Sequence, residues 1–167
     1  MRKIGNKEQG ITLITLTITV IVLIILAGIG IYSGRDTIKK AKLEELQTNL
    51  LLIQAKAREY VEEANFKIGI VSNEERPAKT ATVRDEIYVQ AQGLQPASNI
   101  PEEIKVTDAS ACYYLTEETK NKWGLEKMQG EGQYMIEFDE MNVKVEVYNL
   151  EGYDGKYSLS DIDQVEK

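Results

Sequence analysis

Residues 10–32 constrain this 167-residue chain more than any other stretch, because no charged residue interrupts them. They read GITLITLTITVIVLIILAGIGIY, and fourteen of the 22 residues from Ile11 to Tyr32 are isoleucine, leucine or valine. A helix needs about 20 apolar residues to cross the hydrocarbon core of a bilayer. A lone strand of the same composition would leave its backbone polar groups unsatisfied in lipid. The stretch therefore predicts a membrane-spanning helix over residues 11–34.

The ten residues before this stretch, MRKIGNKEQG, carry a net charge of +2. Positive charge keeps that end of a membrane helix in the cytoplasm. We therefore expect a single pass through the cytoplasmic (inner) membrane, with the residues after Tyr32 outside. A secretory signal peptide is one alternative, but its apolar region spans only about 7–15 residues. An uncut signal anchor is the other alternative.

Gly10 lies at the junction of charge and hydrocarbon, and Ile-Thr-Leu-Ile follows it. This junction resembles the cleavage and methylation segment of the type IV pilin and type II secretion pseudopilin family. The resemblance is close over residues 1–66 and extends to the rest of the chain only in general architecture. It implies that a prepilin peptidase cuts after Gly10 and methylates the new N-terminus, Ile11. It also implies assembly with other pilin or pseudopilin subunits into a cell-surface filament.

The sequence departs from the family pattern at Thr15, because the family commonly carries a glutamate five residues into the mature chain. Pilin-like proteins of Gram-positive bacteria often lack this glutamate. The proline that often bends the family's helix is also absent near Tyr32. A threonine offers only a hydroxyl for registering subunits, so we expect weak self-registration and a minor or initiating subunit.

Small and hydroxyl side chains mark the predicted assembly seam of the membrane helix. Thr12, Thr15 and Thr19 share one helix face, and Gly30 and Gly34 form a small-x-x-x-small pair. Within a bilayer, such residues allow close backbone approach and hydrogen bonds between helices. The alternative for the threonines is a hydrogen bond to a carbonyl of their own helix.

Residues 35–66 predict an amphipathic continuation of the same helix. Apolar residues recur at alternating intervals of three and four, which is the pattern of a narrow helical stripe. The stripe consists of Leu43, Leu46, Leu50, Ile53, Ala57, Tyr60 and Ala64. A self-paired coiled coil is the alternative, but three heptads are short and the alanines are weak seam residues. We expect the stripe to pack on the chain's own C-terminal sheet.

Residues 67–167 predict one extracytoplasmic α+β domain. A polar loop with Pro77 precedes a short helix over residues 83–92, and a second helix follows the N-cap Thr116. Strands are predicted over residues 111–115, 133–138, 143–147 and 157–159, with turns at 139–142 and 153–156. The complete expectation is a type IV pilin-like fold, in which residues 1–10 are the leader and a long helix packs on a small antiparallel sheet.

The sequence offers little for catalysis. It contains no histidine, and its one cysteine, Cys112, is expected to be a small buried residue. Asp154, Asp161 and Asp163 lack the spacing of a calcium loop, so a solvated acidic turn is expected there. Residues 67–167 carry a net charge of −9, which disfavours nucleic acid. We therefore expect no enzyme activity, no cofactor and no metal.

Together these patterns predict a structural pilin-like or pseudopilin subunit that is held in the membrane and then assembled through its N-terminal helix. The alternative from another class is a monomeric single-pass protein whose outer domain binds a ligand or a cell-wall polymer.

Overall fold

The computed structural model describes residues 8–128 and 132–163, but not the side chains of residues 8–15, 17 and 25–36. The chain forms two compact units, Met1–Lys42 and Leu43–Lys167. The helices of the described residues are α1 (Glu8–Ile68), α2 (Arg76–Arg84), the π-helical η1 (Asp85–Ala91), the 3₁₀ turn η2 (Ala109–Ala111), α3 (Glu117–Lys122) and α4 (Leu159–Asp163). The strands are β1 (Gln95–Pro96), β2 (Cys112–Tyr114), β3 (Tyr134–Asp139), β4 (Lys144–Tyr153) and β5 (Lys156–Ser158).

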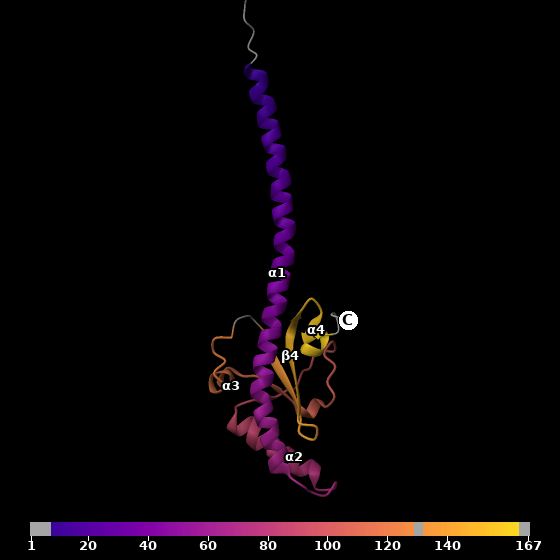
Figure 1. Cartoon of the computed structure of the whole chain (residues 1–167). Helices are drawn as coiled ribbons and strands as arrows, with labels where there is room; N and C mark the ends of the chain where they lie inside the picture. The colour runs from indigo at the N-terminus through magenta and orange to yellow at the C-terminus, as the bar shows by residue number, and fades with distance from the viewer. Residues whose placement is uncertain (1–7, 129–131, 164–167) are drawn as a thin grey trace, which may run out of the picture. The chain divides into compact units, whose positions relative to one another are not determined.

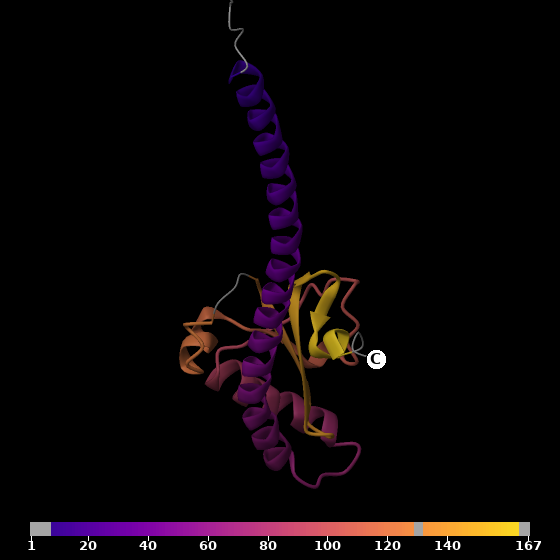
Figure 2. The same cartoon turned by 45° about the horizontal axis from the view of Figure 1, so that its top comes forward.

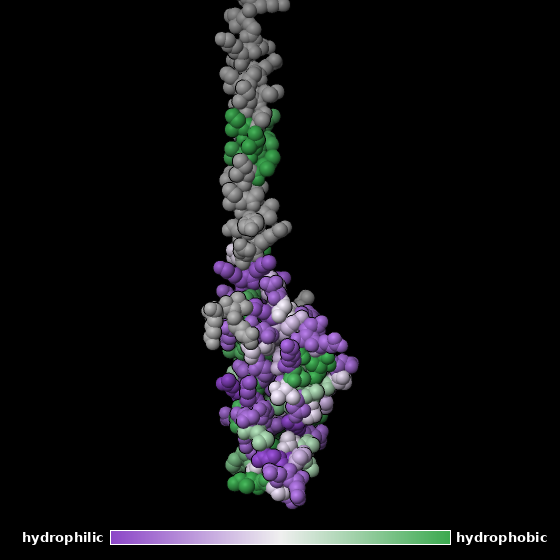
Figure 3. Space-filling view, turned by 90° about the vertical axis from the view of Figure 1, so that its right-hand side faces the viewer, coloured by the Kyte–Doolittle hydropathy of each residue, from purple (hydrophilic) through white to green (hydrophobic). Residues whose placement is uncertain are grey.

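In the first unit, α1 exposes apolar side chains in every direction. The seven large apolar residues described between Leu16 and Ile24 are 45–66% exposed, and they form the green band between the grey segments of the helix in Figure 3. Within the part of the chain that the structure describes, no helix is both long and apolar enough to cross a membrane. Most side chains of the predicted span over residues 11–34 lie outside the described set.

In the second unit, the C-terminal part of α1 runs across the sheet (Figures 1 and 2), and one stripe of its side chains packs against it. Of the predicted stripe, Leu50, Ile53, Ala57 and Ala64 are completely buried, and Leu46 is 6% exposed. Leu43 and Tyr60 are partly buried at its margin. Two further residues that the pattern did not include, Val61 and Ile68, are buried as well. The prediction that the stripe packs on the chain's own sheet is confirmed.

Five antiparallel strands form the sheet, in the sequential order β1-β2-β3-β4-β5. The central hairpin pairs Ile136 with Val147 and Phe138 with Val145, so their side chains face α1 together. The second face carries Met135 and Tyr148, which the segment around Ile104 covers. The α+β class and the antiparallel hairpin are thus confirmed. Residues 94–101, where no helix or strand was predicted, include the two-residue strand β1.

The predicted helix over residues 83–92 begins earlier than expected. Helix α2 starts at Arg76 within the segment expected to be a polar loop, and Pro77 occupies its first turn. Proline is compatible with that position because the first N–H groups of a helix have no intrahelical partner. The helix continues as η1 and ends at Gly93, whose φ of +78° favours glycine.

Val143 was expected to begin a strand, but it lies in the β3–β4 turn. Its φ is +50°, a region that β-branched residues rarely adopt. The turn is closed by Asp139, whose carboxylate accepts hydrogen bonds from the backbone N–H and the side-chain amide of Asn142. This closure places the residue after Asn142 in the left-handed region, and β4 starts one residue later at Lys144.

Helix α3 forms where its capping residues predict it. The Thr116 hydroxyl accepts a hydrogen bond from the N–H of Thr119 at 3.1 Å, and the chain leaves the helix through Trp123 and Gly124. The Trp123 ring stacks on Tyr60 of α1 with 5.3 Å between ring centroids. Its indole N–H donates to Gln92 Oε1 at 3.0 Å. Trp123 thus links α1, the end of η1 and α3.

Candidate functional site

Three amide side chains fasten α1 to the sheet within the second unit. Asn49 Nδ2 donates to the Tyr134 hydroxyl at 3.1 Å, and Gln54 Nε2 donates to the Val145 carbonyl at 2.8 Å. Asn65 Nδ2 donates to the backbone carbonyl of Glu140. Apolar contacts are not directional, whereas each hydrogen bond requires a defined position of the helix. These three bonds therefore fix the register of α1 along the sheet.

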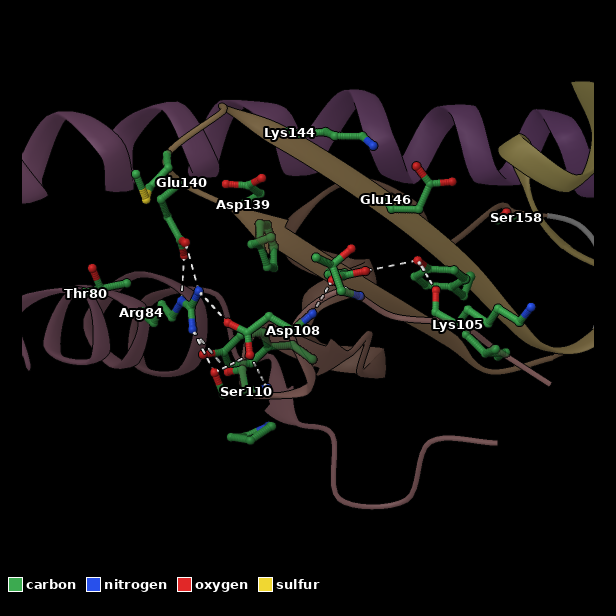
Figure 4. A pocket seen from close by; sticks show the side chains of 18 of the residues that line it. Thr80, Arg84, Lys105, Asp108, Ser110, Asp139, Glu140, Lys144, Glu146 and Ser158 are labelled. Atoms are coloured by element: carbon green, nitrogen blue, oxygen red, sulfur yellow. Dashed lines mark hydrogen bonds and ion pairs between the residues drawn. The ribbon is translucent and has the colours of Figure 1, made fainter. Parts of the chain in front are cut away.

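Glu140 is the centre of a buried polar cluster beside the β3–β4 turn, drawn in Figure 4. Its side chain is only 4% exposed and accepts two hydrogen bonds from one edge of the Arg84 guanidinium, from Nε to Oε1 at 2.8 Å and from Nη2 to Oε2 at 3.0 Å. The Tyr88 hydroxyl donates to the same carboxylate at 3.1 Å. A bidentate arginine pair is the strong, geometrically specific form of this interaction. Glu140 thereby ties the turn to α2 and η1.

Burial and neighbouring charges shift the pKa values of three groups in this cluster. Burial lowers the pKa of Arg84, but the hydrogen bond and charge of Glu140 outweigh it, and the net pKa is raised. Burial together with the Glu140 charge raises the pKa of Tyr88. Hydrogen bonds from Ser110 lower the pKa of Asp108, and Arg84 lies 3.6 Å from that carboxylate. At neutral pH the Arg84 guanidinium and the Asp108 carboxylate are therefore charged, and the Tyr88 phenol keeps its proton.

A second buried carboxylate, Glu137, holds the segment before β2. Its Oε1 accepts the backbone N–H groups of Thr107 and Asp108, each at 2.7 Å, and its Oε2 accepts the Tyr148 hydroxyl at 3.0 Å. Burial, followed by the Glu137 charge, raises the pKa of Tyr148. Sequence reasoning missed both glutamates. The available signal was an acidic residue at position 137 inside an otherwise apolar strand.

Both carboxylates line a groove of about 1060 Å³ on the face of the sheet away from α1. In Figure 4, Lys144 and Glu146 project from β4, while Thr80 and Arg84 come from α2. Arg84 is occupied by Glu140, and Glu146 accepts the Ser160 hydroxyl at 2.8 Å. Asp161 accepts the backbone N–H groups of Tyr157 and Ser158, each at 3.0 Å, so it caps the start of α4. Most of the groove's charged side chains therefore hold the fold together.

Cys112 belongs to the buried cluster with Met135 and Tyr148 and is 1% exposed, as predicted for a small buried residue. Burial, with the charge of Glu137, raises the pKa of its thiol to about 12. The thiolate is the nucleophilic form, so this cysteine is unreactive at neutral pH. Among the residues with described side chains, no group of three potential metal ligands is found.

The site residues predicted from sequence all lie in the first unit. The backbone of Gly10, Ile11, Thr12, Thr15, Thr19, Gly30 and Gly34 is helical within α1. Apart from Thr19, these residues lie outside those whose side chains are described. The Thr19 hydroxyl donates to the Leu16 carbonyl at 2.8 Å, which is the intrahelical bond considered as the alternative above.

Comparisons of the chain with protein-family models, with curated proteins and with solved structures found no match.

Proposed function

We propose that this chain is a type IV pilin-like or pseudopilin subunit, cut after Gly10, methylated at Ile11 and assembled through α1 into a surface filament. Two features support the proposal. The charged leader meets an uninterrupted apolar run at Gly10. The C-terminal part of α1 packs on an antiparallel sheet, which is the architecture that the resemblance implies.

The observation that carries the proposal is the exposure of the apolar residues between Leu16 and Ile24. Seven large apolar side chains open to water on one helix require a cover, because contiguous exposed patches of this kind mark interaction or membrane surfaces. A bilayer supplies that cover before assembly, and neighbouring α1 helices supply it afterwards. Thr12, Thr15, Thr19, Gly30 and Gly34 are the proposed contacts between those helices.

Mass spectrometry of the mature N-terminus tests the proposal. Material from the cell surface should begin at N-methylated Ile11, and Gly10→Leu should leave the leader attached. Gly5→Leu is the matched control, because it changes a leader glycine away from the junction and should be processed normally. Recovery of intact Met1 from wild-type surface material would show that the proposal is wrong.

Thr15 leads to a finer proposal, that this chain is a minor or initiating subunit. An interhelical hydrogen bond from a hydroxyl contributes only about 0.6 kcal/mol on average within a membrane protein. This chain should therefore depend on a co-assembled major subunit for register. Quantitative proteomics of sheared filaments decides the question, since a dominant share for this chain would contradict it.

The groove supports the second candidate, a monomeric membrane-anchored protein that binds a ligand or a cell-wall polymer. A volume of about 1060 Å³ is at the upper end of the usual range for ligand sites. Soluble cell-wall fragments added to the full chain in detergent would shift the NMR signals of Lys144 and Tyr157 if this candidate is correct. Retention of the leader on membrane material would favour it further.

A further inference from the structure

We draw no further inference here: the strongest candidate, the exposed apolar patch that Leu51 and Leu52 form on α1 within the second unit, carries none because nothing in the described part of the chain shows what covers it.

Discussion

The apolar residues between Leu16 and Ile24 and those between Leu46 and Ile68 belong to one helix but meet opposite surroundings. The first group is 45–66% exposed, whereas the stripe in the second group is nearly or completely buried by the sheet. Both groups are helical, so helix formation alone says nothing about how apolar surface is covered. The sheet covers the second group, whereas no described part of the chain covers the first. The four predictions below test this difference.

The largest effect is expected from breaking the buried Arg84–Glu140 pair in the second unit. Arg84→Met should lower the free energy of unfolding by about 3–5 kcal/mol, because it leaves the Glu140 carboxylate buried without its partner. Lys122→Met is the control, since its pair with Glu118 at 2.8 Å is largely exposed and should contribute at most about 1 kcal/mol. Urea denaturation followed by near-ultraviolet circular dichroism measures both. A loss below 1 kcal/mol for Arg84→Met would mean that the cluster is dispensable.

Two neighbouring leucines on α1 differ in burial and should therefore differ in their contribution to stability. Leu50→Ala should cost about 2–5 kcal/mol of unfolding free energy, because Leu50 is completely buried. Leu52→Ala, two residues away and 46% exposed, should change it by less than about 0.5 kcal/mol. The same denaturation experiment compares the two variants. Equal losses would show that α1 does not pack on the sheet as described.

The exposed residues between Leu16 and Ile24 should tolerate an apolar substitution but not a charged one. Ile21→Asp should weaken membrane retention, because an aspartate at the centre of a membrane helix costs about 2.5–3.5 kcal/mol on the insertion scale. Ile21→Leu keeps the side chain apolar and should have no effect. Extraction of membranes with alkaline carbonate separates the outcomes. Full retention of the aspartate variant would argue that this segment is covered by protein instead of lipid.

Alkaline pH should destabilise the second unit, because Tyr113 is buried there. Burial raises the pKa of Tyr113 from 10.0 to about 12, so the unfolded chain releases this proton before the folded chain does. The stabilisation is complete below pH 10 and is lost as the pH rises toward about 12. Tyr113→Phe should reduce the loss of unfolding free energy across that pH window by roughly 1–2 kcal/mol. A slope unchanged by the substitution would show that Tyr113 titrates normally.

Local chemistry made much of the fold predictable. The Thr116 cap, the 3-4 spacing from Leu43 to Ala64 and the strand pattern over residues 133–138 each predicted an element that the structure contains. These signals work because capping, burial and pleat alternation depend on residues close in sequence. The predicted α+β class followed from their order.

Long-range pairings were not predictable in the same way. Arg84 and Glu140 are 56 residues apart, and nothing local marks either as the other's partner. Pro77 was interpreted as a loop residue, although the first turn of a helix also accepts it. Val143 followed the alternation of its strand, but the Asp139–Asn142 closure of the turn overrode that pattern. The processing and seam residues lie almost wholly outside the described side chains and stay predictions.

The stacking of Trp123 on Tyr60 gives the chain a built-in spectroscopic probe. It is the only tryptophan in the sequence, and it is 3% exposed where α1 meets the rest of the second unit. Its emission should shift to longer wavelength when α1 leaves the sheet and water reaches the indole ring. Because no other tryptophan contributes, docking of the helix can be followed by fluorescence in the intact chain, without any label.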